Sequence, residues 1–112
     1  MQIDERVVNG VTILDLKGKI TLGDGDEALK DKINSLMHQD RKSILLNFES
    51  VPYIDSAGLG RLVQTYTTVS RQGGQLKLVN LTKRITDLLS ITKLLTVFET
   101  FDTEQEAFKS YS

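Results

Sequence analysis

The sequence has 112 residues, 39% of them hydrophobic, and a formal net charge of −1 from 14 Lys and Arg against 15 Asp and Glu. This length and apolar content fit one packed core, so we expect a single domain over residues 1–112. The balanced charge argues against a nucleic-acid-binding protein, which usually carries a basic excess or a basic stripe. The absence of cysteine excludes disulfides, thiolate metal sites and cysteine nucleophiles.

The first residues of the sequence do not resemble a targeting segment. Residues 1–6 have neither the charged and apolar pattern nor the cleavage site of a secretory signal peptide. No apolar run approaches the roughly 20 residues that are needed to cross a bilayer. We therefore expect a cytoplasmic protein that does not enter a membrane.

Two segments, residues 3–8 and 11–17, flank the pair Asn9-Gly10. Asn-Gly favours the positive φ angles of a two-residue type I′ turn, so these segments predict a β-hairpin. Residues 23–27 are rich in glycine and acidic residues and predict a turn that leads into a helix. The helix is amphipathic, with apolar positions at Leu29, Ile33, Leu36 and Met37.

The next apolar run, residues 43–48, is short and nearly unbroken, which is typical of a strand covered on both faces. Pro52 cannot donate a hydrogen bond to a strand ladder, so a connecting segment follows. A second amphipathic helix is predicted from Ser56 to the glycine pair 73–74. Its apolar positions are Leu59, Leu62, Val63, Tyr66 and Val69.

A strand over residues 75–79 is followed by a third predicted helix, which Thr82 caps. A short strand around residues 97–98 precedes a last helix, where Thr103 and Glu106 match a capping box. A hairpin followed by alternating helices and strands predicts an α/β fold. We expect one mixed β-sheet of four to five strands with about four helices.

The segment 53–62 follows the most apolar strand and opens a helix, which places Asp55 and Ser56 beside a helix N-terminus. Unpaired backbone N–H groups and partial positive charge at that position suit a phosphate on Ser56. Such a phosphate adds about −2 of charge beside Asp55. Ordinary helix capping, with Gly58 and Gly60 permitting close packing, is the commoner explanation of such residues.

Catalytic and nucleotide-binding patterns have little support in this sequence. A serine nucleophile needs an oriented base, and the only histidine, His38, reads as an exposed residue at the end of the first helix. Asp24 and Asp26 lack the spacing of a calcium loop and are better explained as capping residues. Gly58 and Gly60 lack the third glycine of a dinucleotide-binding loop and the Gly-Lys-Ser/Thr of a P-loop.

Basic residues are also few around the third predicted helix. Lys83 and Arg84, with Lys77 and Lys93 nearby, can form a small basic face, which reads as a solvated rim. Since none of the catalytic, calcium-binding or nucleotide-binding patterns fits this sequence, we expect no catalytic residues, no metal and no cofactor.

The segment 51–60, Val-Pro-Tyr-Ile-Asp-Ser-Ala-Gly-Leu-Gly, resembles the signature of bacterial anti-sigma-factor antagonists, which are STAS domains. Its most specific part is Asp-Ser-x-Gly-Leu. Further similar segments extend the resemblance over nearly the whole chain: residues 18–20, 44–48, 73–78, 85–89 and 97–98.

The resemblance implies partner switching in transcription regulation, of the kind that serves bacterial stress responses and sporulation. An unphosphorylated antagonist binds an anti-sigma factor that is also a serine kinase, and this frees the sigma factor. Ser56 corresponds to the serine that the kinase phosphorylates, and a separate serine phosphatase reverses the modification. The implied partners are this kinase and this phosphatase, with neither nucleic acid nor a membrane.

The sequence departs from the family at Thr21. Members often carry an acidic residue there, directly after the Gly-x-Ile step, and Asp24 and Asp26 are candidate substitutes. An alternative therefore stays open, in which the chain is a STAS interaction or scaffold subunit of a signalling complex without regulatory phosphorylation.

The predicted partner-binding surface joins the turn after the hairpin, the loop before the second helix and the exposed side of that helix. Its residues are Thr21, Asp24, Asp26, Tyr53, Asp55, Ser56, Gly58, Arg61 and Gln64. Thr65 is also expected to be exposed there, because it falls between the apolar positions of the helix.

Overall fold

A mixed five-stranded sheet with four helices forms the structure, a computed structural model that describes residues 1–111. The elements in chain order are β1 (Gln2–Val8), β2 (Val11–Lys17), α1 (Gly25–His38), β3 (Ser43–Ser50), α2 (Ser56–Arg71), β4 (Gln75–Val79), α3 (Lys83–Ile91), β5 (Thr100–Phe101) and α4 (Glu104–Ser110). The strands lie in the order β1-β2-β3-β4-β5. Only β1 and β2 pair antiparallel, and the other neighbours are parallel. The predicted α/β class is confirmed.

The hairpin forms as the sequence predicts. Val8 pairs with Val11, and the two turn residues between them have φ angles of 53° at Asn9 and 76° at Gly10. These positive angles are those of a type I′ turn, whose twist matches that of the flanking strands. The turn fixes the register that places the apolar side of β2 against the helices.

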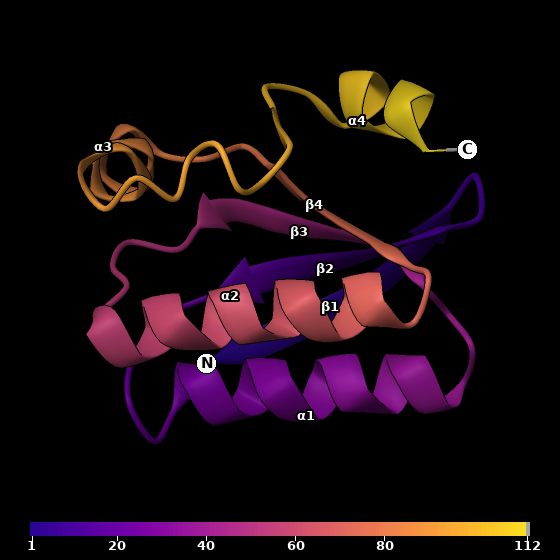
Figure 1. The fold of residues 1–112 in the computed structure, drawn as a ribbon, viewed down its shortest axis with the longest axis horizontal. Coiled ribbons are helices and arrows are strands. Elements are labelled where there is room, and N and C mark those ends of the chain that lie inside the picture. Colours follow the sequence, from indigo (N-terminus) through magenta and orange to yellow (C-terminus); the bar gives the residue numbers. More distant parts are fainter. Residues whose placement is uncertain (112) are drawn as a thin grey trace.

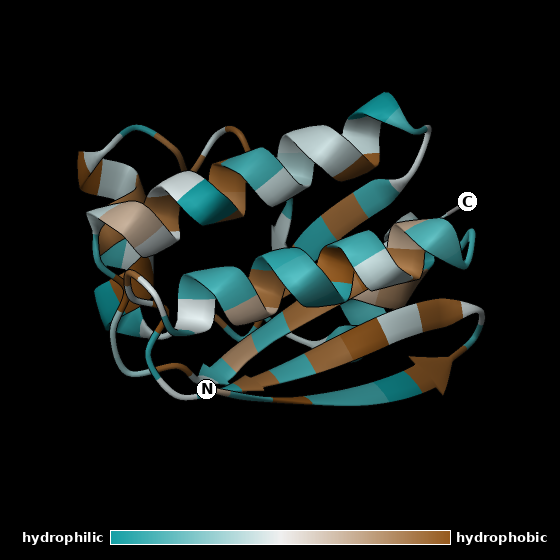
Figure 2. Ribbon diagram, turned by 90° about the horizontal axis from the view of Figure 1, so that it is seen from below, coloured by the Kyte–Doolittle hydropathy of each residue, from teal (hydrophilic) through white to brown (hydrophobic). Residues whose placement is uncertain are grey.

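Helices α1 and α2 cover one face of the sheet (Figure 1). Seen from that side, most of their outward surface is hydrophilic (Figure 2). Their inward positions pack on alternate residues of the central strands, as expected for amphipathic helices on a largely parallel sheet. Representative buried members of this core are Leu14, Leu46 and Leu78 of the sheet, Leu29 and Leu36 of α1, and Leu62 and Val69 of α2.

Helix α4 lies over the opposite face of the sheet and covers part of it (Figure 1). A smaller apolar cluster fills this contact; its buried members are Val11, Ile13, Leu45, Val79 and Ala107. The predicted cap of this helix is confirmed, because the Thr103 hydroxyl accepts a hydrogen bond from the backbone N–H of Glu106 at 3.2 Å. Thr82 caps α3 in the same way, accepting from Ile85 N–H at 3.2 Å.

The predicted strand around residues 97–98 is wrong, since the strand β5 lies at Thr100–Phe101. Val97 closes a turn through a backbone hydrogen bond to Leu94, at 3.0 Å. Phe98 is buried and meets the ring of Tyr66 edge to face, with ring centroids 5.1 Å apart. Phe98 is apolar because it anchors the turn in the core, and the chain becomes extended only beyond it.

The site that the sequence singled out lies at one end of the sheet. β3 ends at Ser50, and the chain crosses from it to the start of α2. A parallel bridge between Ile20 and Ile54 brings the segment that precedes α1 beside the segment that precedes α2. The first turns of both helices therefore meet at the carboxyl ends of β2 and β3.

Candidate functional site at the start of α2

Ser56 is the first residue of α2 and is exposed. The residue before it, Asp55, has extended backbone and caps the helix, because its Oδ1 accepts a hydrogen bond from the backbone N–H of Gly58 at 2.8 Å. Since Asp55 supplies the cap, the Ser56 side chain is not needed for one. Among residues 1–111, none forms a hydrogen bond with the Ser56 hydroxyl.

The Asp55 carboxylate also ties two segments together. Its second oxygen, Oδ2, accepts a hydrogen bond from the backbone N–H of Leu22 at 3.1 Å, within the turn before α1. The N–H groups of Gly58 and Leu22 favour the ionised form and hold the pKa of Asp55 below its ordinary value. A fixed negative charge therefore stands beside Ser56.

The backbone beneath the site is packed closely. Ile20 N–H donates to the carbonyl of Tyr53 at 3.0 Å, and Asp55 N–H donates to the carbonyl of Ile20 at 3.2 Å. A Cβ added at Gly58 would lie less than 3.0 Å from the Ile20 carbonyl oxygen, and one at Gly25 less than 3.0 Å from Lys19. Glycine at the first turn of each helix thus permits direct contact with the same strand-like segment.

The neighbouring Gly60 has a different environment, because a Cβ placed there would meet no heavy atom within 4 Å. Of the two glycines that the sequence predicts to permit close packing, only Gly58 does so. Gly58 is buried, and it therefore positions α2 and contributes no surface of its own.

Asp26 and Arg61 link the first turns of α1 and α2. Asp26 is only 5% exposed and accepts a hydrogen bond from Gly23 N–H at 2.7 Å. The Arg61 guanidinium lies 3.8 Å from Asp26 and donates to the side chain of Gln64. Asp26 and Arg61 therefore hold the two helices together, and of these predicted contact residues Gln64 is the exposed one.

The expectation that Thr65 is exposed is wrong. Its side chain is buried, at 3% exposure, and its hydroxyl donates to the carbonyl of Leu62 at 2.9 Å within the helix. A threonine can occupy an inward position because this bond satisfies its only donor. The exposed strip of α2 is consequently narrower than the apolar spacing predicted.

The turn before α1 presents both polar and apolar side chains. Thr21 is half-buried, and Asp24 is exposed at the N-cap of α1 without a side-chain capping bond. Leu22, which the sequence reasoning missed, is 75% exposed directly beside the site. An isolated apolar residue inside a glycine-rich turn is the signal that could have identified it.

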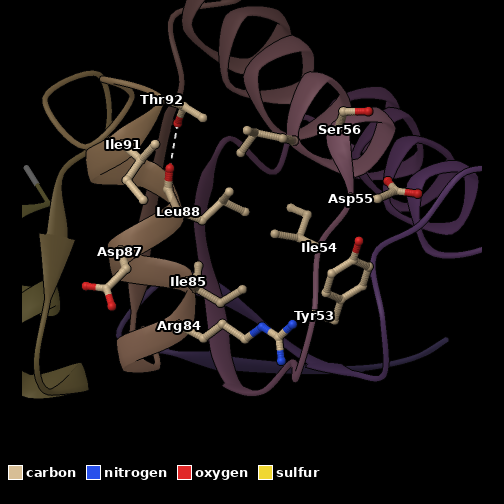
Figure 3. Close-up of a pocket in the computed structure, with 11 residues that line it drawn as sticks. Tyr53, Ile54, Asp55, Ser56, Arg84, Ile85, Asp87, Leu88, Ile91 and Thr92 are labelled. Carbon is tan, nitrogen blue, oxygen red and sulfur yellow. Dashed lines mark hydrogen bonds between the residues drawn. The ribbon is translucent and has the colours of Figure 1, made fainter.

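A groove of about 440 Å³ lies between the start of α2 and helix α3 (Figure 3). Ile54, Ile85 and Leu88 form much of its apolar lining, and Ser56 and Asp55 stand at its edge. Figure 3 shows the oxygen atoms of these two edge residues directed away from the groove. The sequence reasoning placed the contact surface toward α1 and missed this contribution of α3.

Arg84 and Tyr53 form one rim of the groove. The Arg84 guanidinium lies over the Tyr53 ring, 5.3 Å from its centroid, in a cation–π contact. The small basic face that the sequence suggested does not include Lys77, because this side chain is buried. Its ammonium binds the carbonyl of Ser110 at 2.9 Å and the carboxylate of Glu99 at 3.0 Å.

His38 lies at the far end of α1 from the site. It is the last residue of this 14-residue helix, which is about 20 Å long at ~1.5 Å per residue. His38 is exposed, as predicted, and does not approach Ser56. Within the part of the chain that the structure describes, no three His, Asp or Glu side chains gather where they could hold a metal ion.

The model of the STAS domain family matches residues 2–107. The chain belongs to the STAS domain family. An anti-sigma-B factor antagonist of Bacillus subtilis is 38% identical over 71 residues, which are 63% of this chain and 64% of that protein. The TM1081 homologue of Thermotoga neapolitana is 30% identical over 93% of this STAS domain and 92% of its own length.

Solved structures share the fold of this STAS domain. The crystal structure of TM1081 from Thermotoga maritima superposes with a TM-score of 0.88 at 25% identity, covering 96% of this chain and 92% of that one. The anti-sigma factor antagonist SpoIIAA in its unphosphorylated form has a TM-score of 0.72 at 21% identity, with 96% of each chain covered. SpoIIAA has also been solved in its phosphorylated form.

Of all the helices in residues 1–111, none is both long and apolar enough to cross a membrane. The candidate site of this STAS domain lies at one end of the sheet, where the capped start of α2, the exposed Ser56 and an apolar groove adjoin.

Proposed function

We propose that this STAS domain is an anti-sigma-factor antagonist that acts by partner switching. The unphosphorylated form binds an anti-sigma factor with serine kinase activity and so frees a sigma factor. Phosphorylation of Ser56 prevents this binding, and a serine phosphatase restores it. The protein performs no catalysis itself, and it acts in the cytoplasm, where its partners work.

The observation that carries this proposal is the position of the Ser56 hydroxyl. It is exposed at the first residue of α2, while Asp55 already caps the helix and fixes the preceding loop. A kinase can therefore modify Ser56 without breaking a hydrogen bond inside the protein. The added phosphate stands at the positive end of a helix, where the helix dipole favours it.

The same arrangement explains how a phosphate would change binding. It adds about −2 of charge directly beside the fixed carboxylate of Asp55, at the edge of an apolar groove. A partner that covers this edge must then desolvate the phosphate or turn away from it, and either costs free energy. The rigid backbone beneath the site stays as it is, so the surface changes while the fold does not.

A second candidate function is that of a STAS interaction or scaffold subunit without regulatory phosphorylation. The observation that favours it is Thr21, a half-buried hydroxyl residue at a position where the family often has an acidic one. Asp24 is exposed in the same turn and can supply the missing charge, whereas Asp26 is buried and cannot. The first candidate therefore assigns partner contact to Asp24.

Intact-mass measurement after incubation with ATP and anti-sigma kinases of the same genome tests the proposal. We expect a mass increase of one phosphate that is absent in Ser56→Ala and is removed by a serine phosphatase. The phosphorylated protein should also bind the kinase more weakly than the unmodified protein. Stable binding of a kinase without any modification would instead support the scaffold function.

A further inference from the structure

The groove beside Ser56 has the composition of a binding site for an apolar group. Its floor is formed by the buried side chains of Ile54 and Ile85, while Ile91 on its wall is 79% exposed. The volume of about 440 Å³ lies within the roughly 300–1,000 Å³ that is usual for ligand pockets. An aliphatic residue as exposed as Ile91 at the mouth of such a groove gains from being covered.

The charges around the groove are not equally available to a partner. Asp87 lies 2.9 Å from the ammonium of Lys83, and Asp55 accepts two backbone hydrogen bonds. Arg84 is the one cation that lines the groove, and no described residue forms an ion pair or hydrogen bond with its guanidinium. Asp55 keeps its negative charge, but its oxygens are already bonded to backbone N–H groups. Among the groove's charged side chains, Arg84 is therefore the one whose hydrogen-bonding groups are left for a partner.

The geometry points to a specific occupant of this groove, namely a segment of the partner protein in which an apolar side chain adjoins a carboxylate. The apolar side chain enters between α2 and α3, and the carboxylate pairs with the planar donor fork of Arg84. The identity of the partner, the anti-sigma kinase, rests on the proposed function. The partner-binding surface then extends across α3 and is not confined to the turn before α1.

An acidic partner segment in the groove also explains why phosphorylation of Ser56 would weaken binding and not strengthen it. Ser56 stands at the edge of the groove with its hydroxyl directed away from it, so a phosphate there does not enter the groove but adds negative charge at its edge, and this charge repels an incoming carboxylate through space. Repulsion between them weakens binding of the acidic segment, whereas a basic segment would bind more tightly after phosphorylation.

The test compares variants that alter the groove with a matched change elsewhere. Ile91→Asp places a charge at the apolar mouth, and Arg84→Glu reverses the free charge. Each should weaken binding of the unmodified protein to the anti-sigma kinase that modifies Ser56 by about tenfold or more. Arg84→Lys keeps the charge but loses the fork and should weaken binding less.

The matched control is Val7→Asp. Val7 is 60% exposed on β1, and it pairs with Thr12 near the hairpin turn, at the other end of the sheet from Ser56. This variant should bind as the wild type does. Wild-type affinity in both Ile91→Asp and Arg84→Glu would overturn the inference while leaving the phosphorylation of Ser56, and with it the proposed function, intact.

A peptide selection separates the two proposals further. A phage-displayed library of random peptides is selected on the immobilised wild-type protein and, in parallel, on Ile91→Asp. Enrichment on the wild type alone of peptides with an apolar residue next to Asp or Glu supports the inference, even if no kinase modifies Ser56. Enrichment of basic peptides, or of none, overturns it.

Discussion

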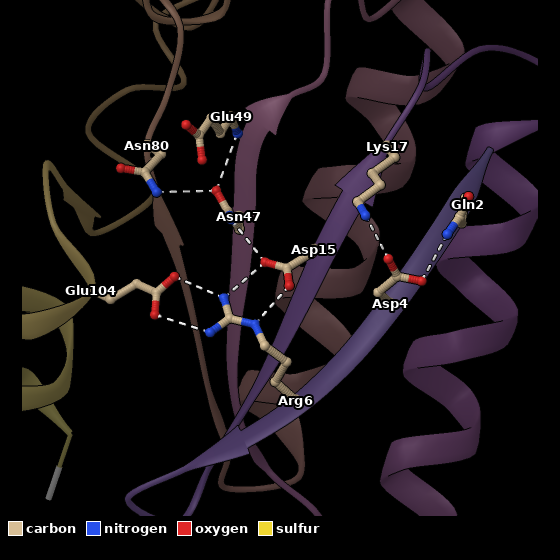
Figure 4. Close-up of polar contacts among 9 residues, drawn as sticks. All are labelled: Gln2, Asp4, Arg6, Asp15, Lys17, Asn47, Glu49, Asn80 and Glu104. Atoms are coloured by element: carbon tan, nitrogen blue, oxygen red, sulfur yellow. Dashed lines mark hydrogen bonds and ion pairs between the residues drawn. The ribbon is translucent and has the colours of Figure 1, made fainter.

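Two groups of polar side chains lie in different parts of the molecule, and they differ in how their hydrogen-bonding groups are used. In the first, Arg6 of β1 pairs with Asp15 at 2.7 and 2.9 Å and with Glu104 of α4 at 2.8 and 3.3 Å (Figure 4). Asn47 donates to Asp15 and accepts from Asn80, at 2.8 and 3.1 Å. Every charge in this group meets a partner inside the protein.

The second group consists of Asp55, Ser56 and Arg84, which line the groove beside the start of α2, and of these three only Asp55 has its hydrogen-bonding groups satisfied, by two backbone N–H groups. The Ser56 hydroxyl and the Arg84 guanidinium form no hydrogen bond with any residue in the range 1–111. The difference separates two roles for polar residues. A network that satisfies itself fastens α4 to the sheet, whereas exposed groups without partners at an apolar groove are available to another molecule.

The largest effect that sharpens this comparison is expected from Gly58→Ala. The added Cβ would clash with the Ile20 carbonyl, so α2 must shift away from the segment on which the whole site is built. Clashes of this kind cost about 3 kcal/mol or more in the free energy of unfolding. Urea denaturation measures the loss, and binding to the anti-sigma kinase should fall with it.

Gly60→Ala is the matched control, two residues later in the same helix. A Cβ at Gly60 meets nothing within 4 Å, and alanine is the better helix former by about 1 kcal/mol. This variant should therefore be more stable than the wild type. Equal effects of the two substitutions would contradict the view that Gly58 is needed for close approach of the helix.

A smaller loss is expected from Arg6→Ala in the self-satisfied network. The substitution removes the charge-assisted bonds to Asp15 and Glu104. Because the Arg6 side chain is 40% exposed, solvent screens the pair, and we expect a loss of about 1–2 kcal/mol. Lys17→Ala, which breaks the more exposed pair with Asp4, should destabilise the protein less than Arg6→Ala does, because solvent screens that pair more fully.

The pH dependence of stability gives this prediction a second readout. Arg6, and then Asn47, favours the ionised form of Asp15 and holds the pKa of Asp15 below its ordinary value of about 4. A lowered carboxyl pKa contributes stability above the unfolded pKa, and the contribution is lost as pH falls through the folded pKa. The difference between wild type and Arg6→Ala should therefore shrink between about pH 5 and pH 2. A difference that stays constant over this range would contradict the assigned role of Asp15.

The elements that the sequence predicted correctly are those set by local chemistry. Asn9-Gly10 fixes the hairpin, Thr82 and Thr103 cap their helices, and Asp55 caps α2. Each of these depends on residues within about four positions of one another. The prediction of a strand at residues 97–98 is wrong because a contact between residues distant in the sequence decides the role of Phe98. Its ring packs against Tyr66, so an apolar residue at this position does not indicate a strand.

The candidate site likewise has one part that could be predicted from the sequence and another part that could not. Asp55 and Ser56 could be found from the sequence because one short segment carries them. The groove could not, because Ile54, Leu59 and Ile91 meet only when α3 folds back beside α2. The ion pair between Asp26 and Arg61 likewise joins residues 35 positions apart, and it turns two expected contact residues into positioning residues.

The smallest effect on stability, and the sharpest test of the comparison, is expected at Ser56 itself. Ser56→Ala removes an exposed hydroxyl that bonds to no described residue, so the free energy of unfolding should change by less than about 0.5 kcal/mol. Ser56→Asp adds a negative charge at the start of α2, which the helix dipole favours by about 0.3–1 kcal/mol. The same charge stands at the edge of the groove and should weaken binding of the anti-sigma kinase, as titration calorimetry can measure. Repulsion from the neighbouring Asp55 carboxylate opposes the gain in stability, so Ser56→Asp should be about as stable as the wild type yet a weaker binder, a combination that a purely structural serine could not produce. Equal loss of stability and binding in both variants would instead place Ser56 with the self-satisfied polar residues.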